Sequence, residues 1–267
     1  SWRRYSYGNF TGIRIMGVFQ NNLLAGAAAA ASAGGAAFYD YQIEQSIRMD
    51  ANNSDHLRRT PSSAGNRTTW SFSAWLKRAS LDDGGFILEA GTSGHQDSRM
   101  FWSFRSGENG IQASSGETNY GASTAQLRDT GGWNHFFIKH SSNTNLLYLN
   151  GNQIKSSTIS GNTAVNNTVV HGIGNRASGT GDFFSGYMAE VLLFDGTAYD
   201  PTDVAESKNG VWIPKDPSSL SFGTNGVHLK FENASDLGND SSGNNNDFTA
   251  NNMGADHQVL DSPTFGS

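Results

Sequence analysis

The spacing of the carboxylates decides whether this sequence can hydrolyse a glycosidic bond. That reaction needs two carboxyl groups that flank the bond, one as an acid and the other as a nucleophile or base. Side chains on a strand share a face only at even spacing. None of the seven glutamates has an aspartate two residues later, and in the best candidate pair, Glu190 and Asp195, the two residues are five apart. We therefore predict that the chain is not an enzyme.

Histidine and cysteine restrict the remaining chemistry. The chain has no cysteine, which excludes disulfides, a thiol nucleophile and thiolate metal sites. Its seven histidines are scattered, without the His-x-x-x-His spacing of a zinc site. No Gly-x-Ser-x-Gly motif lies near His135 or His140. Only a triad assembled from residues far apart in the sequence stays open.

Alternating apolar residues predict a β protein. Trp70, Phe72, Ala74 and Leu76 fall on one face of a strand. The Asn-Gly pair at 150–151 predicts a hairpin turn. Only residues 201–208 have the pattern of a helical turn, which Asn209-Gly210 would end. Further strands are expected at 85–89, 100–104, 135–139, 146–149, 190–194 and 227–232. Many strands and almost no helix predict two antiparallel sheets packed as a jelly-roll sandwich.

The N-terminal residues differ from the rest. Residues 25–37 are all alanine, glycine or serine, a composition that forms either a short helix packed on another chain or a flexible linker. Residues 79–267 contain nine basic and twenty acidic residues, which argues against nucleic acid as a partner. No window approaches the roughly 20 apolar residues of a membrane helix. We therefore expect neither nucleic-acid nor membrane binding.

Two segments resemble a known fold family. Gly-Trp-Asn-His-Phe at 132–136, followed by Leu-Tyr-Leu-Asn-Gly at 147–151, resembles the signature of laminin-G-like and pentraxin-like domains. Residues 184–196 resemble the late strand of the same concanavalin A-like jelly rolls. The resemblance covers residues 46–250 and implies a laminin-G-like sandwich. It also implies a structural, hydrogen-bonded role for His135.

The same resemblance implies a calcium ion at a rim loop, and residues 239–247 are the best candidate. Calcium takes oxygen ligands from carboxylates, amides and the backbone. Asp240, Asn244 and Asn246 are the candidate ligands within the loop. Asp50 matches the acidic position of the related families and would join them if the first and last strands are neighbours. The alternative is a turn whose Asn and Asp side chains bond its own backbone.

Sugar binding by such folds uses exposed aromatic rings and amides. Trp75, Trp102, Tyr120 and Trp212 are the candidate platforms. The alternative for each is packing in the core, where aromatic side chains of sandwiches are common. The sequence does not decide between these roles, so the ligand-binding residues stay unassigned.

Several phrases, including residues 39–50, 59–66 and 240–244, resemble laminin-G-type domains of tailed-bacteriophage virion proteins. The resemblance implies a tail fibre or appendage on the virion, an extracellular particle, with a lectin-like domain for host-surface glycan. Residues 1–45 would anchor the chain to other virion proteins or sister chains, with a homotrimer as the expected oligomer. Residues 251–267 would form a tail or linker to a further domain. The alternatives are a capsid decoration protein and, less favoured, a polysaccharide-degrading enzyme.

Overall fold

Apolar side chains at alternate positions of strand β3 (Thr69–Arg78) point into the core of the domain. The computed structural model describes residues 38–81, 85–91, 100–104, 110–115, 118–177 and 181–265. Within them, Trp70, Phe72, Ala74 and Leu76 all point into one buried cluster. Strand β3 pairs on one side with β12 (Gly186–Asp195) and on the other with β8 (Asn134–Ser141). The predicted face of this strand is confirmed.

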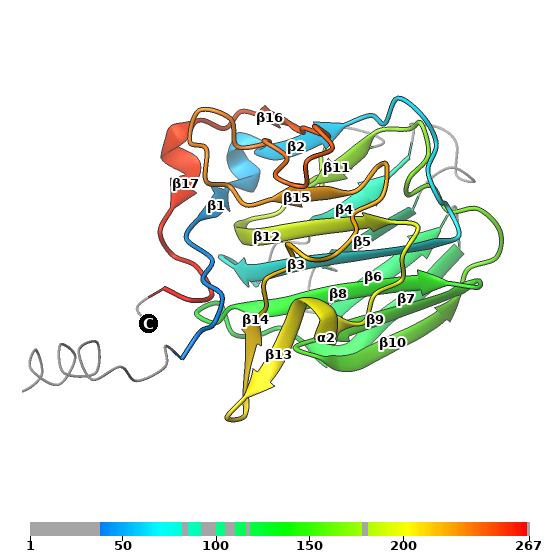
Figure 1. Ribbon diagram of the computed structural model, residues 1–267, viewed down its shortest axis with the longest axis horizontal. Helices are drawn as coiled ribbons and strands as arrows, with labels where there is room; N and C mark the ends of the chain where they lie inside the picture. Colours follow the sequence, from blue (N-terminus) through cyan, green and yellow to red (C-terminus); the bar gives the residue numbers. More distant parts are fainter. Residues whose placement is uncertain are drawn as a thin grey trace, which may run out of the picture. The chain divides into compact units, whose positions relative to one another are not determined.

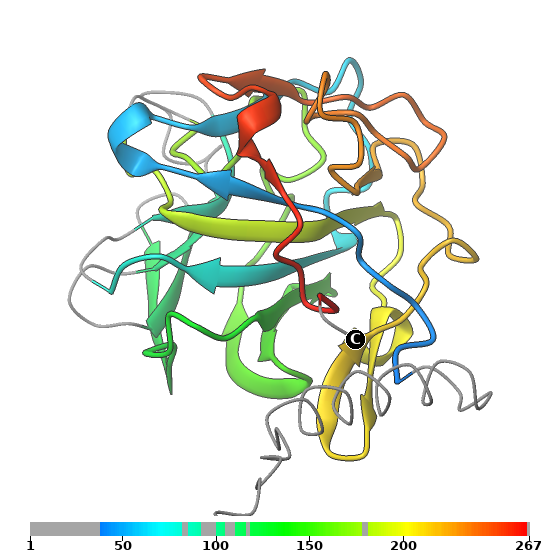
Figure 2. The same cartoon turned by 90° about the vertical axis from the view of Figure 1, so that its left-hand side faces the viewer.

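Two large antiparallel sheets make up most of the described part of the domain (Figures 1 and 2). The first has the order β10 (Asn152–Thr158), β9 (Thr144–Leu149), β8, β3, β12, β1 (Ser46–Met49) and β17 (Gln258–Val259), with β15 (Val227–Leu229) also paired to β12. The second has the order β16 (Thr249–Asn251), β2 (His56–Arg59), β11 (His171–Ile173), β4 (Phe86–Ala90), β5 (Met100–Phe104), β6 (Gly110–Ser115) and β7 (Thr118–Gln126). The expected all-β sandwich is confirmed.

The core lies between the sheets, and the first sheet buries its other face as well. Phe136 and Ile138 of β8 point into the main core, whereas Phe137 belongs to a second cluster with Leu192 and Phe194. A third cluster holds Trp75 with Ile43, Ala189 and Ala205. The segment around α2 (Pro201–Val204) and the hairpin of β13 (Ala205–Lys208) and β14 (Val211–Pro214) supply part of this cover. In Figure 1 the hairpin projects below the sandwich.

Residues 201–208 differ from the predicted helical turn. Only Pro201–Val204 is helical, and Ala205–Lys208 is strand β13. Asn209 and Gly210, expected to end a helix, have φ values of 54° and 81°. Because a two-residue hairpin turn needs positive φ at both positions, this pair turns the chain from β13 into β14. The same turn chemistry holds at Asn150-Gly151, where the predicted hairpin is present.

The chain ends also differ from the expected boundaries. The anchoring segment 1–45 lies largely outside the described residues, and so does the whole Ala-rich stretch 25–37. Ile43, however, is buried against the first sheet and donates its backbone N–H to Thr264 Oγ1 at 2.9 Å. Ser46 pairs with Val259, so residues described beyond 250 complete the sheet and run beside β1 in both views. The sandwich therefore extends past residue 250 on one side and before residue 46 on the other.

Short 3-10 turns complete the described elements, at η1 (Ala51–Asn53) and η3 (Ala255–His257). In the part of the chain that the structure describes, no helix has the length and apolar character needed to cross a membrane.

Candidate functional site

A hollow of about 590 Å³ brings two tryptophans together with polar groups. It is lined by Trp133, residues 150–152, Ser207 and residues 210–212, and we call it the tryptophan groove. The residues come from the start of β8, the β9–β10 turn and the β13–β14 hairpin. Both indoles are partly exposed, and Val211 beside them is 48% exposed. The groove thus presents aromatic surface next to amide and hydroxyl groups.

A chain of hydrogen bonds fixes the indole of Trp212. Its Nε1 donates to His135 Nδ1 at 3.0 Å, and His135 Nε2 lies 2.8 Å from Ser73 Oγ. Burial lowers the pKa of His135 to about 3, so the imidazole is neutral and can accept the indole proton. The polar edge of Trp212 is therefore held against the sheet. The expected structural, hydrogen-bonded role of His135 is what the geometry shows.

The turn at Asn150-Gly151 presses against the same ring. A Cβ atom on Gly151, which has a φ of 76°, would lie 2.6 Å from Trp212 Cη2. The side chain of Asn150 accepts the backbone N–H of His135 at 2.7 Å and donates to Asn134 Oδ1 at 3.0 Å. The hairpin turn is thereby tied to β8, and its glycine gives the indole room.

The second indole is held from another direction. Trp133 Nε1 donates to Asp261 Oδ1 at 3.1 Å, and the same carboxylate forms an ion pair with Lys77. The ammonium of Lys77 lies 5.6 Å from the ring centroid of Trp133 and 4.6 Å from that of Tyr187. Cations at these distances are attracted to aromatic faces. The C-terminal segment therefore helps to position one wall of the groove.

The structure separates the four candidate platforms. Trp212 is the one that lines the groove, whereas Trp75 and Trp102 are buried. The side chain of Tyr120 lies outside the described residues. Sequence reasoning missed Trp133 as a platform, because it was used only as part of the Trp-x-His signature. The available clue was its position at the end of a loop, directly before β8.

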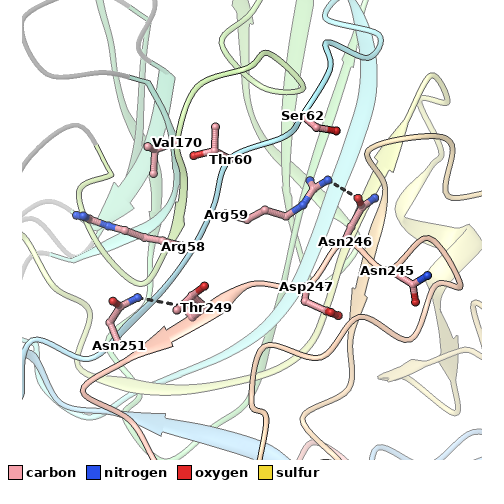
Figure 3. A pocket seen from close by; sticks show the side chains of 10 residues that line it. All are labelled: Arg58, Arg59, Thr60, Ser62, Val170, Asn245, Asn246, Asp247, Thr249 and Asn251. Atoms are coloured by element: carbon pink, nitrogen blue, oxygen red, sulfur yellow. Dashed lines mark hydrogen bonds between the residues drawn. The ribbon is translucent and has the colours of Figure 1, made fainter.

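A second hollow, of about 550 Å³, is lined by residues from 58–62, by Val170 and by residues from 245–251 (Figure 3). We call it the rim pocket. Arg59 donates to Asn246 Oδ1, and Asn251 Nδ2 donates to the Thr249 carbonyl at 2.9 Å. Burial lowers the pKa of Arg59, against the attraction of Asp240 and Asp247. The pocket offers polar groups but no aromatic ring.

Of the four candidate calcium ligands, those in the loop lie near one another, but their side chains are hydrogen-bonded to the protein itself. Asp240 is 7% exposed, and each of its carboxylate oxygens accepts two hydrogen bonds. The donors are the backbone N–H groups of His228, Ser242 and Asn246 and the hydroxyl of Ser242, at 2.8–2.9 Å. These oxygens are fully used by the protein. They do not fit the role of calcium ligands without loss of those bonds.

The amides and the fourth candidate fit no better. Asn244 and Asn246 both point their Nδ2 at the Gly226 carbonyl, at 3.1 and 2.8 Å, and the oxygen of Asn246 faces the cation of Arg59. Asp50 caps its own 3-10 turn by accepting the N–H of Asn52 at 2.9 Å. The first and last strands are neighbours as supposed, but the loop precedes β16, which pairs in the other sheet. Within the described residues no hydrogen bond joins the side chain of Asp50 to the loop, and no cluster of three His, Cys, Asp or Glu side chains that could hold a metal ion is present.

Glu190 and Asp195, the candidate pair of carboxylates, belong to separate hydrogen-bond networks. Glu190 accepts from Tyr41 at 2.8 Å and lies 2.7 Å from His228 Nε2. Asp195 accepts the backbone N–H groups of Asn66 at 2.6 Å and Asn225 at 2.9 Å. Both side chains are buried and cross-link distant segments. Neither lines the groove or the rim pocket.

The buried imidazoles predict an acid-sensitive fold. Burial lowers the pKa of His135 to about 3 and those of His140 and His171 to about 4. The unfolded chain takes up these protons near the ordinary histidine pKa of 6.5, so it binds more protons than the folded chain below that pH. We expect the free energy of unfolding to fall as the pH drops from 6.5 toward 4, by up to about 1.4 kcal/mol per pH unit for each histidine. Urea unfolding between pH 7 and pH 5 measures this. His135→Gln should reduce the slope by about one third, and a flat profile would contradict the assignment.

The loop geometry predicts no stabilisation by calcium. A ligand that binds only the folded state raises the melting temperature. Because the oxygens of Asp240 are already bonded, we expect Ca²⁺ at about 5 mM to shift Tm by less than about 1 °C relative to EDTA. Differential scanning calorimetry checks this. A saturable rise of several degrees that Asn244→Ala removes would restore the calcium site.

The comparisons agree with the observed architecture. The family model described as the concanavalin A-like lectin/glucanases superfamily, laminin-G type, matches residues 51–205. A Bacteroides ovatus protein to which carbohydrate binding is attributed superposes with a TM-score of 0.56 at 17% identity, over 79% of this chain and 59% of its own. The extracellular region of zebrafish Gpr126/Adgrg6 gives 0.51 at 15% identity, over 82% and 26%. Compared with curated proteins, the chain has no significant match. At these identities the two structures show the fold alone, and the family match shows that the chain belongs to the concanavalin A-like lectin/glucanase superfamily.

Proposed function

We propose that the chain is a non-enzymatic, lectin-like domain that binds glycan in the tryptophan groove. The observation that carries the proposal is that Trp133 and Trp212 line the same hollow as Asn152 and Ser207. A pyranose ring has apolar C–H faces and an edge of hydroxyls. An indole packs on the face, while amide and hydroxyl groups bond the edge.

The groove is supported by structure that holds its rings in place before a sugar arrives. Trp212 is bonded to His135 at 3.0 Å and Trp133 to Asp261 at 3.1 Å. A ring that is already oriented loses little conformational entropy on binding. The B. ovatus protein to which carbohydrate binding is attributed shares the fold, which supports a glycan as the ligand class.

The absence of catalysis is part of the proposal. Glu190 and Asp195 are engaged with separate partners in the interior, and the tryptophan groove has no carboxylate among its lining residues. A glycosidase needs two carboxyl groups about 5–10 Å apart across the bond. We expect that incubation of the chain with host polysaccharide produces no new reducing ends.

The proposed location of the domain rests on the sequence segments that resemble tailed-bacteriophage virion proteins. We propose that the domain is displayed on a virion appendage such as a tail fibre, with residues 1–45 as the anchor to other virion proteins and a homotrimer as the assembly. Labelling of intact particles with an antibody to the domain tests the location. Label along the fibres supports the proposal, and a regular array on the head would favour the capsid decoration alternative.

Replacement of one groove tryptophan tests the binding surface. We expect Trp212→Ala to weaken binding of the glycan that gives the strongest signal on a glycan array by at least about fivefold, since a lost stacking contact is worth roughly 1 kcal/mol or more. Trp212→Phe keeps a ring and should retain part of the affinity. Isothermal titration of the full chain measures both.

The matched control is Phe265→Ala, because Phe265 is 67% exposed and does not line the groove. This variant should bind like the wild type. Equal binding by Trp212→Ala, in a variant that melts at the wild-type temperature, would remove the groove as the site.

A further inference from the structure

A row of polar side chains crosses the inner face of the first sheet. The strand register places His140 of β8 opposite Asn145 of β9, and Asn145 opposite Ser157 of β10. Trp70 of β3 lies opposite His140 on the other side and stacks on its ring at 5.3 Å. Phe136 and Ile138 occupy the same face of β8 and belong to the main core. The row therefore points into the sandwich.

The polar atoms of these side chains are buried. His140 and Asn145 have no exposed surface. Among the residues that the structure describes, both ring nitrogens of His140, both amide atoms of Asn145 and the hydroxyl of Ser157 have no hydrogen-bond partner. Trp102 belongs to the facing sheet, and its ring centroid lies 5.4 Å from that of Trp70. Its indole N–H also has no hydrogen-bond partner among the described residues. Six such atoms at one place are exceptional, because nearly all buried polar atoms in folded proteins are bonded.

The neighbouring structure closes the site and leaves it small. Ile159 N donates to the Asn143 carbonyl at 2.8 Å, and Ile159, Ala164 and Val165 are buried in the core where the chain leaves β10. On the facing sheet Trp102 is paired with Ala113, whose side chain is a single methyl group. A guest here must be small, because the row has no opening to solvent at His140 or Asn145.

The hydrogen-bond donors and acceptors of these four side chains determine which small molecule could bind between them. A neutral histidine offers one donor and one acceptor, an asparagine offers both kinds, a serine hydroxyl offers both, and an indole only donates. Burial lowers the pKa of His140 to about 4, so the ring is neutral at pH 7. No charged side chain belongs to the row, and an ion buried without a counter-charge would be costly. The matching guest is a neutral molecule that both donates and accepts.

We propose that His140, Asn145, Ser157 and Trp102 form an internal hydration site that holds ordered water between the two sheets. Buried waters of this kind commonly make about three hydrogen bonds to groups that are otherwise unsatisfied. The water would join β8, β9 and β10 to β5 across the core, a polar link in an apolar interior. The proposal is independent of glycan binding.

Water-selective NOE and ROE spectra of the full chain, labelled with ¹⁵N, test the site. We expect cross-peaks from water to the indole N–H of Trp102 and the side-chain amide of Asn145, with opposite signs in the two spectra. Opposite signs mark a water that resides at the site and tumbles with the protein, whereas proton exchange gives equal signs. The indole of Trp212, bonded directly to His135, should give no such peak.

A variant separates bound water from a relay through the serine hydroxyl. In Ser157→Ala the cross-peaks to Trp102 and Asn145 should persist, since the other members of the row still hold the water. In Asn145→Leu the Trp102 peak should weaken or vanish. Absent peaks in the wild type, peaks of equal sign, or loss of the peaks in Ser157→Ala would overturn the proposal, and none of these outcomes needs the leucine variant to fold.

Discussion

The apolar interior shared by two sheets is the constraint on which the rest of the structure depends. Alternate residues of β3 and β8 are committed to it, including the fully buried Trp70 and Phe136. In most antiparallel sandwiches the other face of each sheet is free for solvent or ligand. Here much of the outer face of the first sheet is buried too, around Phe137 and Trp75. On this side of the domain, the surface that a ligand can reach therefore lies in the loops and at the edges of the segments that cover the first sheet.

The tryptophan groove lies at such an edge, where a hairpin meets the β9–β10 turn. The hydrogen bonds from Trp212 through His135 to Ser73 connect the groove wall to the central strand of the sheet. A neutral imidazole in the middle of this chain both accepts and donates, and burial keeps it neutral. The signature histidine of the family thus acts as a positioning residue for an aromatic surface. The buried hydrogen bonds of His135 thus belong both to the packing of the sheet and to the candidate site.

The alternation of apolar residues predicted most of the fold, because apolar side chains at every second position from 70 to 76 place one face of a strand in the main core. It failed where local chemistry is ambiguous. Asn209-Gly210 suits both a helix end and a hairpin turn, and tertiary packing of β13 on β14 selected the turn. The loop around Asp240 has the oxygen atoms of a calcium site, but sequence cannot show that backbone N–H groups use them. Likewise, the sequence cannot distinguish the buried Trp102 from the partly exposed Trp133, since exposure depends on which strands and loops cover each ring.

The most direct test of the central claim follows the six tryptophans of the chain separately. Indole ¹H–¹⁵N resonances of the full chain are recorded during titration with the glycan that gives the strongest array signal. We predict that the indole resonances of Trp133 and Trp212 shift in a saturable way, while those of the buried Trp70, Trp75 and Trp102 do not. Saturable binding that leaves Trp133 and Trp212 unmoved would contradict it and would place recognition elsewhere on the domain.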